Sequence, residues 1–558
     1  MRRKWWGWGD PNKVDELESH PTLYSFLKSQ LNLSGSESYP TARAEDIKLP
    51  ESKLTKDLMA ELIRVTAPEN VCGGDIARLI HSAGLGYKDI IRLRRGLLPD
   101  YVDAVVYPVD ERQVVKVLKV CEENYIEVLP YGGGSSVVGS FEVIRDRGSG
   151  GVIAVDMTVM GRLMKLDATS GLATFEAGVS GPDIEAQLAP HGFTLGHFPQ
   201  SFEYSTLGGW IATRSAGSSS DIYGKIEDMV VSLRVATPKG IVETKTVPKS
   251  AAGPDLRQLF LGSEGTMGII TQATMVVRRV PQAKAYSSFL FKSFDRGIEA
   301  LRQLVQSRVK GSTLRLSDER ETWAFYNSAG EAVSTSSKLK QEVGKWYVAK
   351  RGFSFEDGSL LMAITQGGPN EIDGERKFIA DVCHAHGGIS LGSSPAEAWL
   401  ESRFDQPYLR DSMISHGIMV DTLETATVWS NVRRLHDAVA VAITTELERR
   451  GFSSLVTCHL SHSYPSGSSL YFTFMSRQQE GKELDQWEAV KYAATSAIVE
   501  NGGTISHHHG VGLEHSRWMV AEDGEQGVAA LKALKAALDP KGILNPGKLL
   551  PRKEARTP

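Results

Sequence analysis

The sequence predicts an α+β protein with two main domains and a helical N-terminal extension, on three observations. The chain has 558 residues, enough for roughly two to four domains, and its 41% hydrophobic and 23% charged residues are typical of a globular protein. Short strand-like runs and amphipathic helices mix along the chain without a regular βαβ repeat. Three loops rich in glycine, serine and threonine lie close together between residues 130 and 271.

The order of the predicted elements divides the chain into four parts. Residues 1–98 are expected to be mostly helical, because stretches such as "DLMAELIRVT" repeat apolar residues at helical spacing. Residues 99–280 combine strand-like runs ("DAVVYPVD", "IEVLP", "GVIAVD") with helices and carry the three polar loops. Residues 281–505 form a second α+β unit, with strands such as "SLYFTFM" and a long helix in "SNVRRLHDAVAVAITTELERRG". Residues 506–558 contain a helix that ends at Pro540.

Charge, cysteine content and hydropathy exclude several classes of protein. The net charge of −4 gives no basic surface of the kind that binds nucleic acid. The four cysteines (Cys72, Cys121, Cys383 and Cys458) are far apart, so neither a disulfide framework nor a structural zinc site is expected. No stretch approaches the ~18 apolar residues of a membrane-spanning helix. We therefore expect a cytoplasmic protein without nucleic-acid partners; the C-terminal "ARTP" is no recognisable peroxisomal signal.

The stretch "PYGGGSSVVGS" (130–140) is the first indication of a ligand site. Its three successive glycines allow unusual backbone angles and bring backbone N–H groups close to a ligand, as in a pyrophosphate cradle. It is neither a Walker sequence nor a G-x-G-x-x-G motif, and by itself a plain surface turn explains it equally well. Two further loops, "PQSFEYSTLGGWIATRSAGSSSDIYGKIEDM" (199–229) and "GSEGTMGIIT" (262–271), favour a long polar ligand held along its length.

Together these stretches resemble the flavin-binding domain of the vanillyl-alcohol-oxidase superfamily. More narrowly, the chain resembles the alkyldihydroxyacetonephosphate (alkylglycerone-phosphate) synthases from "KWWGWGDP" to "LDPKGILNPGKLL". "GHFPQSFEYSTLGGW", "IYGKIEDMVV" and "GPDLRQLFLGSEGTMGIIT" carry the likeness to the flavin domain, and "HHHGVG" points to the synthase branch. The resemblance implies an FAD-binding domain (99–280), a cap or substrate domain (281–505), and a C-terminal segment that packs back on the FAD-binding domain.

The resemblance also implies bound FAD. Relatives with covalent flavin attach it through a His or Cys near these loops, whereas the glycine loop here has Tyr131 with neither type adjacent, so non-covalent binding is expected. The implied cofactor contacts are Pro130, Tyr131, Gly132, Gly133, Gly134, Ser135, Ser136, Gln200, Ser201, Phe202, Glu203, Tyr204, Ser205, Thr206, Ala212, Thr213, Arg214, Ser215, Glu264, Gly265, Thr266, Met267, Gly268, Ile269 and Ile270.

The resemblance makes three residues of the second domain candidates for catalytic or substrate-binding roles. Tyr471, in the strand-like "SLYFTFM", matches the catalytic tyrosine, which can accept a proton if nearby cations lower its pKa from ~10. Arg410 matches an arginine that binds the substrate phosphate, for which a planar guanidinium is suited, and Arg315 matches another active-site arginine. Taken alone, the residues are better explained as a core tyrosine and two surface or ion-paired arginines.

The sequence "NGGTISHHHGVGLEH" contains three consecutive histidines. In an extended segment His507 and His509 point to one side and His508 to the other, so the three do not converge easily on one metal ion. An H-E-x-x-H spacing is also missing, and no metal site is expected. The resemblance places this trio in the active site, where protonated rings would bind phosphate and favour a tyrosinate, and neutral rings would relay protons.

The implied activity is FAD-dependent exchange of the acyl chain of an acyl dihydroxyacetone phosphate for a long-chain fatty alcohol, giving an ether-lipid precursor. The alternative is an FAD-dependent 2-hydroxyacid dehydrogenase or oxidase acting on D-lactate or glycolate. Such relatives commonly carry an "HVGDGNLH"-like metal motif where this chain reads "SHSYPSGSSLYF", which favours the synthase. A flavin-binding protein without turnover is a third interpretation. It is disfavoured because Tyr471, Arg410 and the histidines match the residue types that the synthases use.

The stretch "KLKQEVGKWYVAKRGF" (338–353) mixes basic and aromatic residues and resembles the matching region of ether-lipid synthases. It is compatible with gating a lipid tunnel or touching an anionic membrane surface, and equally with a solvated helix that has a packed aromatic face. Peripheral membrane contact and formation of a homodimer are therefore left open by the sequence.

Overall fold

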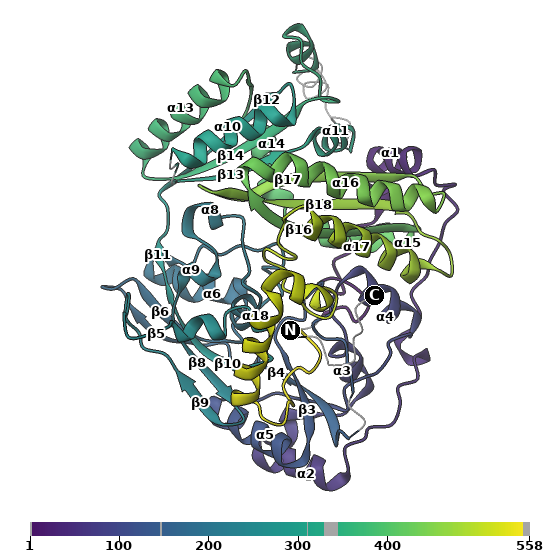
Figure 1. The fold of residues 1–558 in the computed structure, drawn as a ribbon, viewed down its shortest axis with the longest axis vertical. Helices are drawn as coiled ribbons and strands as arrows, with labels where there is room; N and C mark the ends of the chain where they lie inside the picture. Colours follow the sequence, from purple (N-terminus) through teal and green to yellow (C-terminus); the bar gives the residue numbers. More distant parts are fainter. Residues whose placement is uncertain (1–2, 146–147, 308, 310, 329–343, 551–558) are drawn as a thin grey trace.

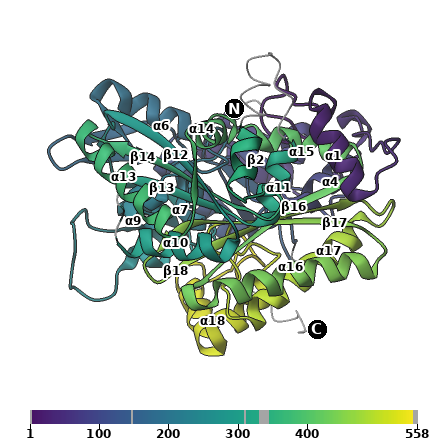
Figure 2. The ribbon, with the colours of Figure 1, turned by 90° about the horizontal axis from the view of Figure 1, so that it is seen from above.

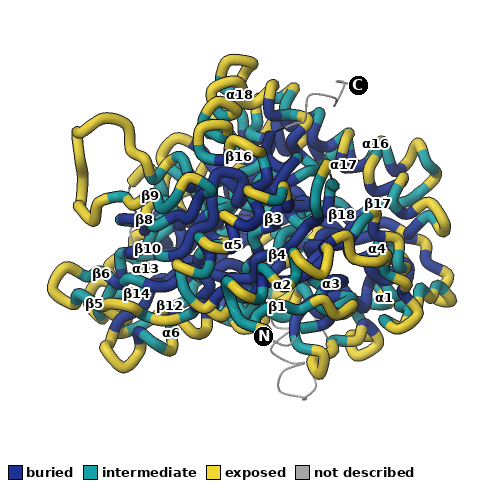
Figure 3. Tube along the Cα trace, turned by 90° about the horizontal axis from the view of Figure 1, so that it is seen from below, coloured by how far each residue is buried: buried dark blue, intermediate teal, exposed yellow. Residues whose placement is uncertain are grey.

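The computed structural model describes residues 3–145, 148–307, 309, 311–328 and 344–550. Two bodies lie one above the other in Figure 1, with the cap domain at the top and the flavin domain below. The C-terminal segment, in yellow, runs from the cap down along the flavin domain. Figure 3 shows the central strands of the flavin domain as buried, whereas its edge strands are partly exposed.

The flavin domain contains two larger sheets and a two-stranded one, in which β11 (Arg278–Arg279) pairs with β7 (Phe193–Thr194). The first has the order β1-β2-β4-β3, in which β2, β4 and β3 are parallel and α5 connects β2 to β3, so that a local βαβ unit exists where the sequence predicted no regular repeat. The second sheet, β5-β6-β10-β8-β9, is antiparallel. The bounds are β1 (Val71–Cys72), β2 (Ala104–Val106), α5 (Glu111–Asn124), β3 (Ile126–Tyr131), β4 (Gly151–Asp156), β5 (Leu163–Asp167), β6 (Leu172–Glu176), α6 (Gly181–Leu188), α7 (Leu207–Thr213), α8 (Ser220–Tyr223), α9 (Ile226–Met229), β8 (Val230–Thr237), β9 (Gly240–Glu243) and β10 (Ile269–Val276).

The cap domain is a seven-stranded antiparallel sheet covered by helices. Its strand order is β15-β12-β14-β13-β17-β18-β16. The strands are β12 (Ala283–Phe291), β13 (Ser312–Ser317), β14 (Ser359–Gly367), β15 (Ile389–Gly392), β16 (Ile418–Val428), β17 (Ser454–Tyr464) and β18 (Gly467–Arg477). The helices are α10 (Phe294–Gln306), α11 (Glu319–Ser328), α13 (Pro369–Ala385), α14 (Ser394–Ser402), α15 (Gln406–Ser415), α16 (Val432–Arg449) and α17 (Glu483–Glu500). Figure 2 shows α16 and α17 side by side along the sheet.

Alternation along the cap strands separates a packed face from a face that is free to bind a ligand. In β18, Leu470, Phe472 and Phe474 are buried in the core together with residues of α10, α13, α16 and α17. Tyr471 and Thr473 point to the opposite face, because successive side chains of a strand alternate. The hydrophobic face of β18 therefore packs against the helices, and its other face is directed toward the flavin domain.

Both ends of the chain connect the two domains. The N-terminal part contains α1 (Pro21–Leu31), α2 (Lys56–Val65), α3 (Asp75–Ile80) and α4 (Tyr87–Arg95). α1 packs on α11 and β17 of the cap, whereas α2 packs on α5 and β1 pairs with β2 of the flavin domain. At the other end, α18 (Met519–Leu538) precedes a segment in which the Ile543 carbonyl accepts from the Val128 N–H at 2.8 Å. The C-terminal segment thus contacts β3 of the flavin domain.

The lysine-rich segment is only partly described. Lys338 and Lys340 lie outside the described residues, whereas residues 344–350 are helical. Trp346 is 60% exposed, and the Lys350 ammonium lies 4.5 Å from the centroid of its ring. Within the described ranges, no helix is both long and apolar enough to cross a membrane. Membrane contact and homodimer formation stay predictions.

Candidate active site

A cavity of about 640 Å³ lies between the inner face of the cap sheet and the three polar loops of the flavin domain. This volume is in the usual range for small-molecule sites. Its wall includes Arg315, Arg410, Tyr471, His508 and His509, so most residues that the sequence singled out are brought to one place.

The glycine loop follows the end of β3 and has the features of an anion cradle. The backbone N–H groups of residues 132–136 donate to no acceptor among the described residues. A Cβ atom on Gly133 would stand 1.6 Å from the Tyr204 carbonyl oxygen, and Gly134 has a φ of +64°. Free N–H groups on a closely packed loop that begins with three glycines suit a pyrophosphate. The loop therefore fits the phosphates of FAD.

Most of the predicted cofactor contacts line this cavity. They are Pro130, Tyr131, Gly132, Gly133, Gly134, Ser135, Ser136, Gln200, Ser201, Ser205, Thr206, Ala212, Thr213, Ser215, Glu264, Gly265, Gly268, Ile269 and Ile270. Phe202, Glu203, Tyr204, Arg214, Thr266 and Met267 are not part of the wall.

Several of these remaining residues have structural contacts instead. The Phe202 ring stacks on Phe404 with 5.6 Å between centroids, and Tyr204 packs edge-on against Trp8. Arg214 donates to the Gln258 side chain at 2.8 Å, and Met267 is buried in the core of the flavin domain. Proximity in sequence to a ligand loop is thus no guarantee that a side chain faces the ligand.

The register of the cap sheet places three polar residues in one row. Tyr471 in β18 is directly opposite Glu424 in β16 and directly opposite His459 in β17. Directly opposed residues point to the same face of a sheet. The row therefore lies on the face toward the flavin domain, where Tyr471 and His459 line the cavity.

Tyr471 is a half-buried phenol surrounded by imidazole rings. The centroid of its ring lies 5.0 Å from that of His459, 6.0 Å from that of His508 and 5.6 Å from that of His509. Burial raises the pKa of Tyr471 to about 12, against the opposing effects of a hydrogen bond with Thr422 and the charge of Arg410. Tyr471 is therefore protonated at neutral pH, and its anion would be a strong base.

The two predicted arginines have different surroundings. Arg315 Nη2 donates to Glu321 Oε1 at 3.0 Å and lies 3.0 Å from His459 Nδ1. Burial opposes ionisation of Glu321, but the charges of Arg315 and His459 outweigh it and lower the pKa of Glu321 to about 2. The charge of Arg315 is therefore largely balanced within the protein, and its contact with His459 orients that ring beside Tyr471.

Arg410 has more N–H donors than hydrogen-bond partners among the described residues. Its Nη1 atom donates to the Leu85 carbonyl at 2.9 Å. Its Nε and Nη2 atoms are buried without a hydrogen-bond partner among the described residues, although the Asp411 carboxylate lies 3.9 Å from Nη2. Buried donors without partners are costly, so a guanidinium held in this way is suited to an anionic ligand.

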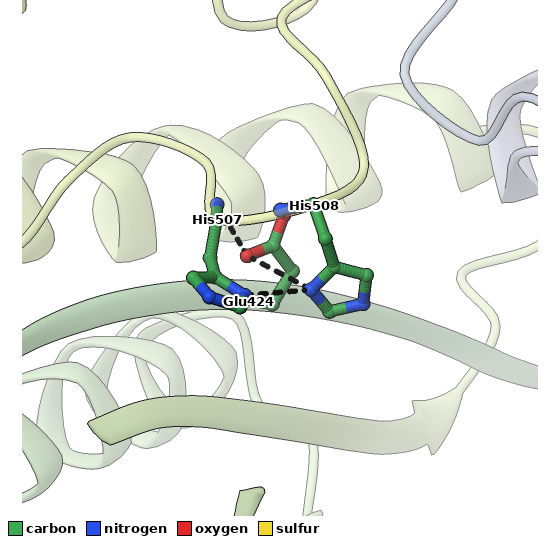
Figure 4. Close-up of side chains that lie close together, drawn as sticks. All are labelled: Glu424, His507 and His508. Atoms are coloured by element: carbon green, nitrogen blue, oxygen red, sulfur yellow. Dashed lines mark hydrogen bonds and ion pairs between the residues drawn. The ribbon is translucent and has the colours of Figure 1, made fainter. Parts of the chain in front are cut away.

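Glu424 holds the histidine loop from the cap side. Figure 4 shows this side chain reaching from its strand to the loop above. Its carboxylate accepts the backbone N–H groups of His507 at 2.5 Å, His508 at 3.0 Å and His509 at 2.9 Å. The Ser506 hydroxyl donates to it at 2.8 Å. One buried side chain thus fixes the course of three successive residues.

Glu424 is ionised although it is buried. Burial alone would raise its pKa, but the surrounding histidine loop, with its backbone N–H groups, holds the pKa of Glu424 below its usual range. Burial also lowers the pKa of His507 and of His509, so these rings are neutral near pH 7. The backbone N–H dipoles, rather than ring charges, therefore stabilise the carboxylate.

Residues of the flavin domain also bind the histidine loop. The Glu264 carboxylate accepts the N–H groups of Val511 at 2.6 Å and Gly512 at 2.8 Å, together with the Ser140 hydroxyl at 3.2 Å. The Lys225 ammonium donates to the His507 carbonyl at 2.6 Å. The loop is therefore clamped between the two domains, and it closes one side of the cavity.

The cluster of Glu424, His507 and His508 has the composition of a metal site. One potential ligand atom from each lies within 4.8 Å of the others. However, both oxygens of Glu424 accept backbone N–H groups, and His507 Nδ1 and His508 Nδ1 share a hydrogen bond of 3.1 Å. The geometry is explained by these hydrogen bonds, and the absence of a bound metal ion stays a prediction.

Sequence reasoning missed Glu424, Lys225 and His459 as site residues. Glu424 lies in "IMVDTLETATV", whose only signal is two acidic residues in a largely apolar strand. Lys225 belongs to "IYGKIEDM", which indicated the flavin domain without a role for the lysine. Only the strand register and the packing of the loop reveal what these residues contact.

Comparison with protein families agrees with this geometry. Residues 102–245 match the family described as "FAD binding domain", and residues 280–549 match "FAD linked oxidases, C-terminal domain". The chain is thus a two-domain FAD-dependent enzyme, which confirms the predicted fold class and the predicted cofactor.

The similar proteins define the family more narrowly. The alkyldihydroxyacetonephosphate synthase of Trypanosoma brucei brucei is 35% identical, over 98% of this chain and 92% of that protein. The synthase of Dictyostelium discoideum is 34% identical, over 98% and 93%. A solved structure of an alkyldihydroxyacetonephosphate synthase has a TM-score of 0.84 and 32% identity, over 97% of this chain and 98% of its own. The chain belongs to the alkyldihydroxyacetonephosphate synthase family.

The flavin is expected to be released by denaturation. The cavity-lining parts of the three flavin-domain loops contain neither His nor Cys, although His459, His462, His508 and His509 reach the cavity from the cap and the C-terminal loop. Acid precipitation of the purified protein should leave a yellow supernatant with the mass of FAD. Flavin that remains in the pellet would show attachment to a side chain, and peptide mass analysis would then identify which one.

Proposed function

We propose that this protein exchanges the acyl chain of an acyl dihydroxyacetone phosphate for a long-chain fatty alcohol and so forms an ether. The observation that carries the proposal is the pairing of Arg410, with its buried unpartnered donors, and Tyr471 in one cavity. The first offers charge-assisted contacts to a phosphate, and the second offers an oxygen for proton transfer. Membership of the synthase family supports the same reaction.

The cavity wall also contains apolar residues suited to fatty chains. Leu23, Phe26 and Leu27 come from α1, and Phe325 comes from α11. Burying an alkyl chain against such residues contributes roughly 0.8 kcal/mol per CH₂ group. The N-terminal extension thereby helps to form the part of the site that would receive the acyl or alkyl chain.

Tyr471 acts in this scheme as the group that removes a proton from C1 of the substrate and later returns it. Its high pKa makes the anion a strong base, and the neutral rings of His508 and His509 lie beside it on the same cavity wall. Bound FAD would supply the electrophile that the reacting carbon requires. Arg410 holds the phosphate, which fixes C1 relative to Tyr471.

The principal alternative is oxidation of a 2-hydroxyacid. The turn between β17 and β18 reads "SHSYPSGSSLYF" rather than the metal-binding sequence typical of such enzymes. In the row across this sheet, Tyr471 instead stacks on His459, and Glu424 accepts backbone N–H groups of the histidine loop. Both features favour the synthase.

Replacing Arg410 by Ala should weaken binding of the phosphorylated substrate. A charge-assisted hydrogen bond contributes roughly 1.5–3 kcal/mol, so the dissociation constant should rise about tenfold or more. Titration of the variant with acyl dihydroxyacetone phosphate, at wild-type flavin content, measures the effect. Arg302→Ala, at an exposed arginine of α10 that pairs with Glu299, is the matched control. Wild-type affinity in Arg410→Ala would remove this residue from the phosphate site.

Replacing Tyr471 by Phe should abolish most ether formation while it preserves the packing of the ring. Loss of a group that transfers protons typically costs ~10²-fold or more in rate. Mass analysis of products from acyl dihydroxyacetone phosphate and a fatty alcohol measures the change. Tyr492→Phe, at a 39% exposed tyrosine of α17, should behave as wild type.

The same assay separates the two enzyme classes. The wild-type protein should produce the ether, and its flavin absorbance should not bleach under anaerobic conditions with D-lactate or glycolate. Rapid bleaching with a hydroxyacid, without any ether product, would contradict the synthase and leave only the flavin fold in place.

A further inference from the structure

A line of hydrogen-bonded side chains begins at the cavity wall and leads away from the cavity. His508 lines the cavity, whereas His507 does not. The Nδ1 atoms of the two rings share a hydrogen bond of 3.1 Å. The other nitrogen of His507, Nε2, shares a hydrogen bond of 2.7 Å with the Tyr464 hydroxyl. Three side chains are therefore connected in series.

The far end of this line reaches the surface. Tyr464 is the last residue of β17 and is only half-buried. It lines a second hollow, an open groove of about 830 Å³ whose walls include the polar residues Asn431, Arg434 and Ser466. The series of side chains thus begins at the buried cavity, which His508 lines, and ends at the open groove, which Tyr464 lines.

Each member of the series can both accept and donate a proton. Burial, together with the charges of Lys225 and of neighbouring rings, lowers the pKa of His507 and His508 well below the usual value. Each ring is therefore neutral and has one N–H group and one free nitrogen. Burial raises the pKa of Tyr464, so its hydroxyl keeps its proton.

The backbone around the series is held rigidly. Glu424 accepts the N–H groups of both His507 and His508, and Lys225 donates to the His507 carbonyl. These contacts fix the two residues from the cap and from the flavin domain. Proton transfer along hydrogen bonds requires such fixed donor–acceptor distances.

We propose that His508, His507 and Tyr464 form a proton relay from the cavity to the surface groove. The proposal rests on the proposed function, which releases one proton per turnover. The bond between C1 and the acyl oxygen breaks, the bond between C1 and the alcohol oxygen forms, and the fatty acid leaves as a carboxylate. The proton of the alcohol hydroxyl is left over, and the buried cavity needs a path for it.

The transfers balance along the series. His508 Nε2 receives the proton from the cavity, and its Nδ1 proton passes to His507 Nδ1. The Nε2 proton of His507 then passes to the Tyr464 oxygen, and the original hydroxyl proton of Tyr464 passes to water in the groove. Reversal of the ring and hydroxyl orientations, or a return hop, restores the starting state. No oxidant or reductant is required.

Replacing Tyr464 by Phe tests the relay, because the ring remains while the hydroxyl is lost. Ether formation at low buffer concentration should fall about tenfold or more, the scale of a weakened proton transfer. Imidazole at high concentration should restore turnover by accepting the proton directly, and the solvent deuterium isotope effect should fall as it does so. Flavin content and the KM for acyl dihydroxyacetone phosphate should stay at wild-type values.

Tyr492→Phe is the matched control and should depend on imidazole no more than the wild type does. A Tyr464→Phe variant that turns over normally in dilute buffer would overturn the relay. So would a loss of rate that imidazole does not restore, because that result would indicate a structural role.

A second readout does not depend on turnover. Nitrogen NMR of ¹⁵N-histidine-labelled protein should show His507 protonated at Nε2 in the wild type, with a changed tautomer balance in Tyr464→Phe. A wild-type His507 protonated only at Nδ1 would contradict the direction of transfer. If the wild type forms no ether but His507 shows the expected tautomer, the proposed function fails while the hydrogen-bonded series stands.

Discussion

The site depends on one arrangement: two buried carboxylates, one from each domain, that accept the backbone N–H groups of a single loop. Glu424 of the cap holds residues 507–509, and Glu264 of the flavin domain holds residues 511 and 512. Burying a carboxylate is costly unless several donors satisfy it. The loop N–H groups therefore satisfy both carboxylates, and the two carboxylates hold the loop from both domains.

This mutual dependence explains how residues far apart in the sequence form one site. The register of β16, β18 and β17 sets Glu424, Tyr471 and His459 in a row. Because Glu424 fixes the loop, the row also sets where His508 and His509 stand relative to Tyr471. The glycine loop of the flavin domain faces this row across the cavity. The strand register and the Glu424 contacts thus place Tyr471 and the histidines opposite the loop that fits the cofactor phosphates.

Much of this fold could be predicted from the sequence, but only part of the site. Strands such as "IEVLP" and the helix at 432–449 follow local patterns, so they were predicted close to where they occur. The glycine loop and the histidine trio are distinctive in the sequence and also belong to the site. Glu424 carries no such signal, because its role arises from strand register and from a loop about eighty residues away. Tyr464 likewise becomes notable only through its contact with His507.

Hydrogen–deuterium exchange of the loop amides tests the two-carboxylate clamp most directly. Glu424→Gln removes the charge that holds the amides of residues 507–509, and loss of a charge-assisted contact of roughly 1.5–3 kcal/mol should speed their exchange about tenfold or more. Glu264→Gln should act first on residues 511 and 512, and the double variant should loosen the whole loop. Glu500→Gln, at the exposed end of α17, is the control. Wild-type protection of residues 507–512 in both single variants would contradict the account.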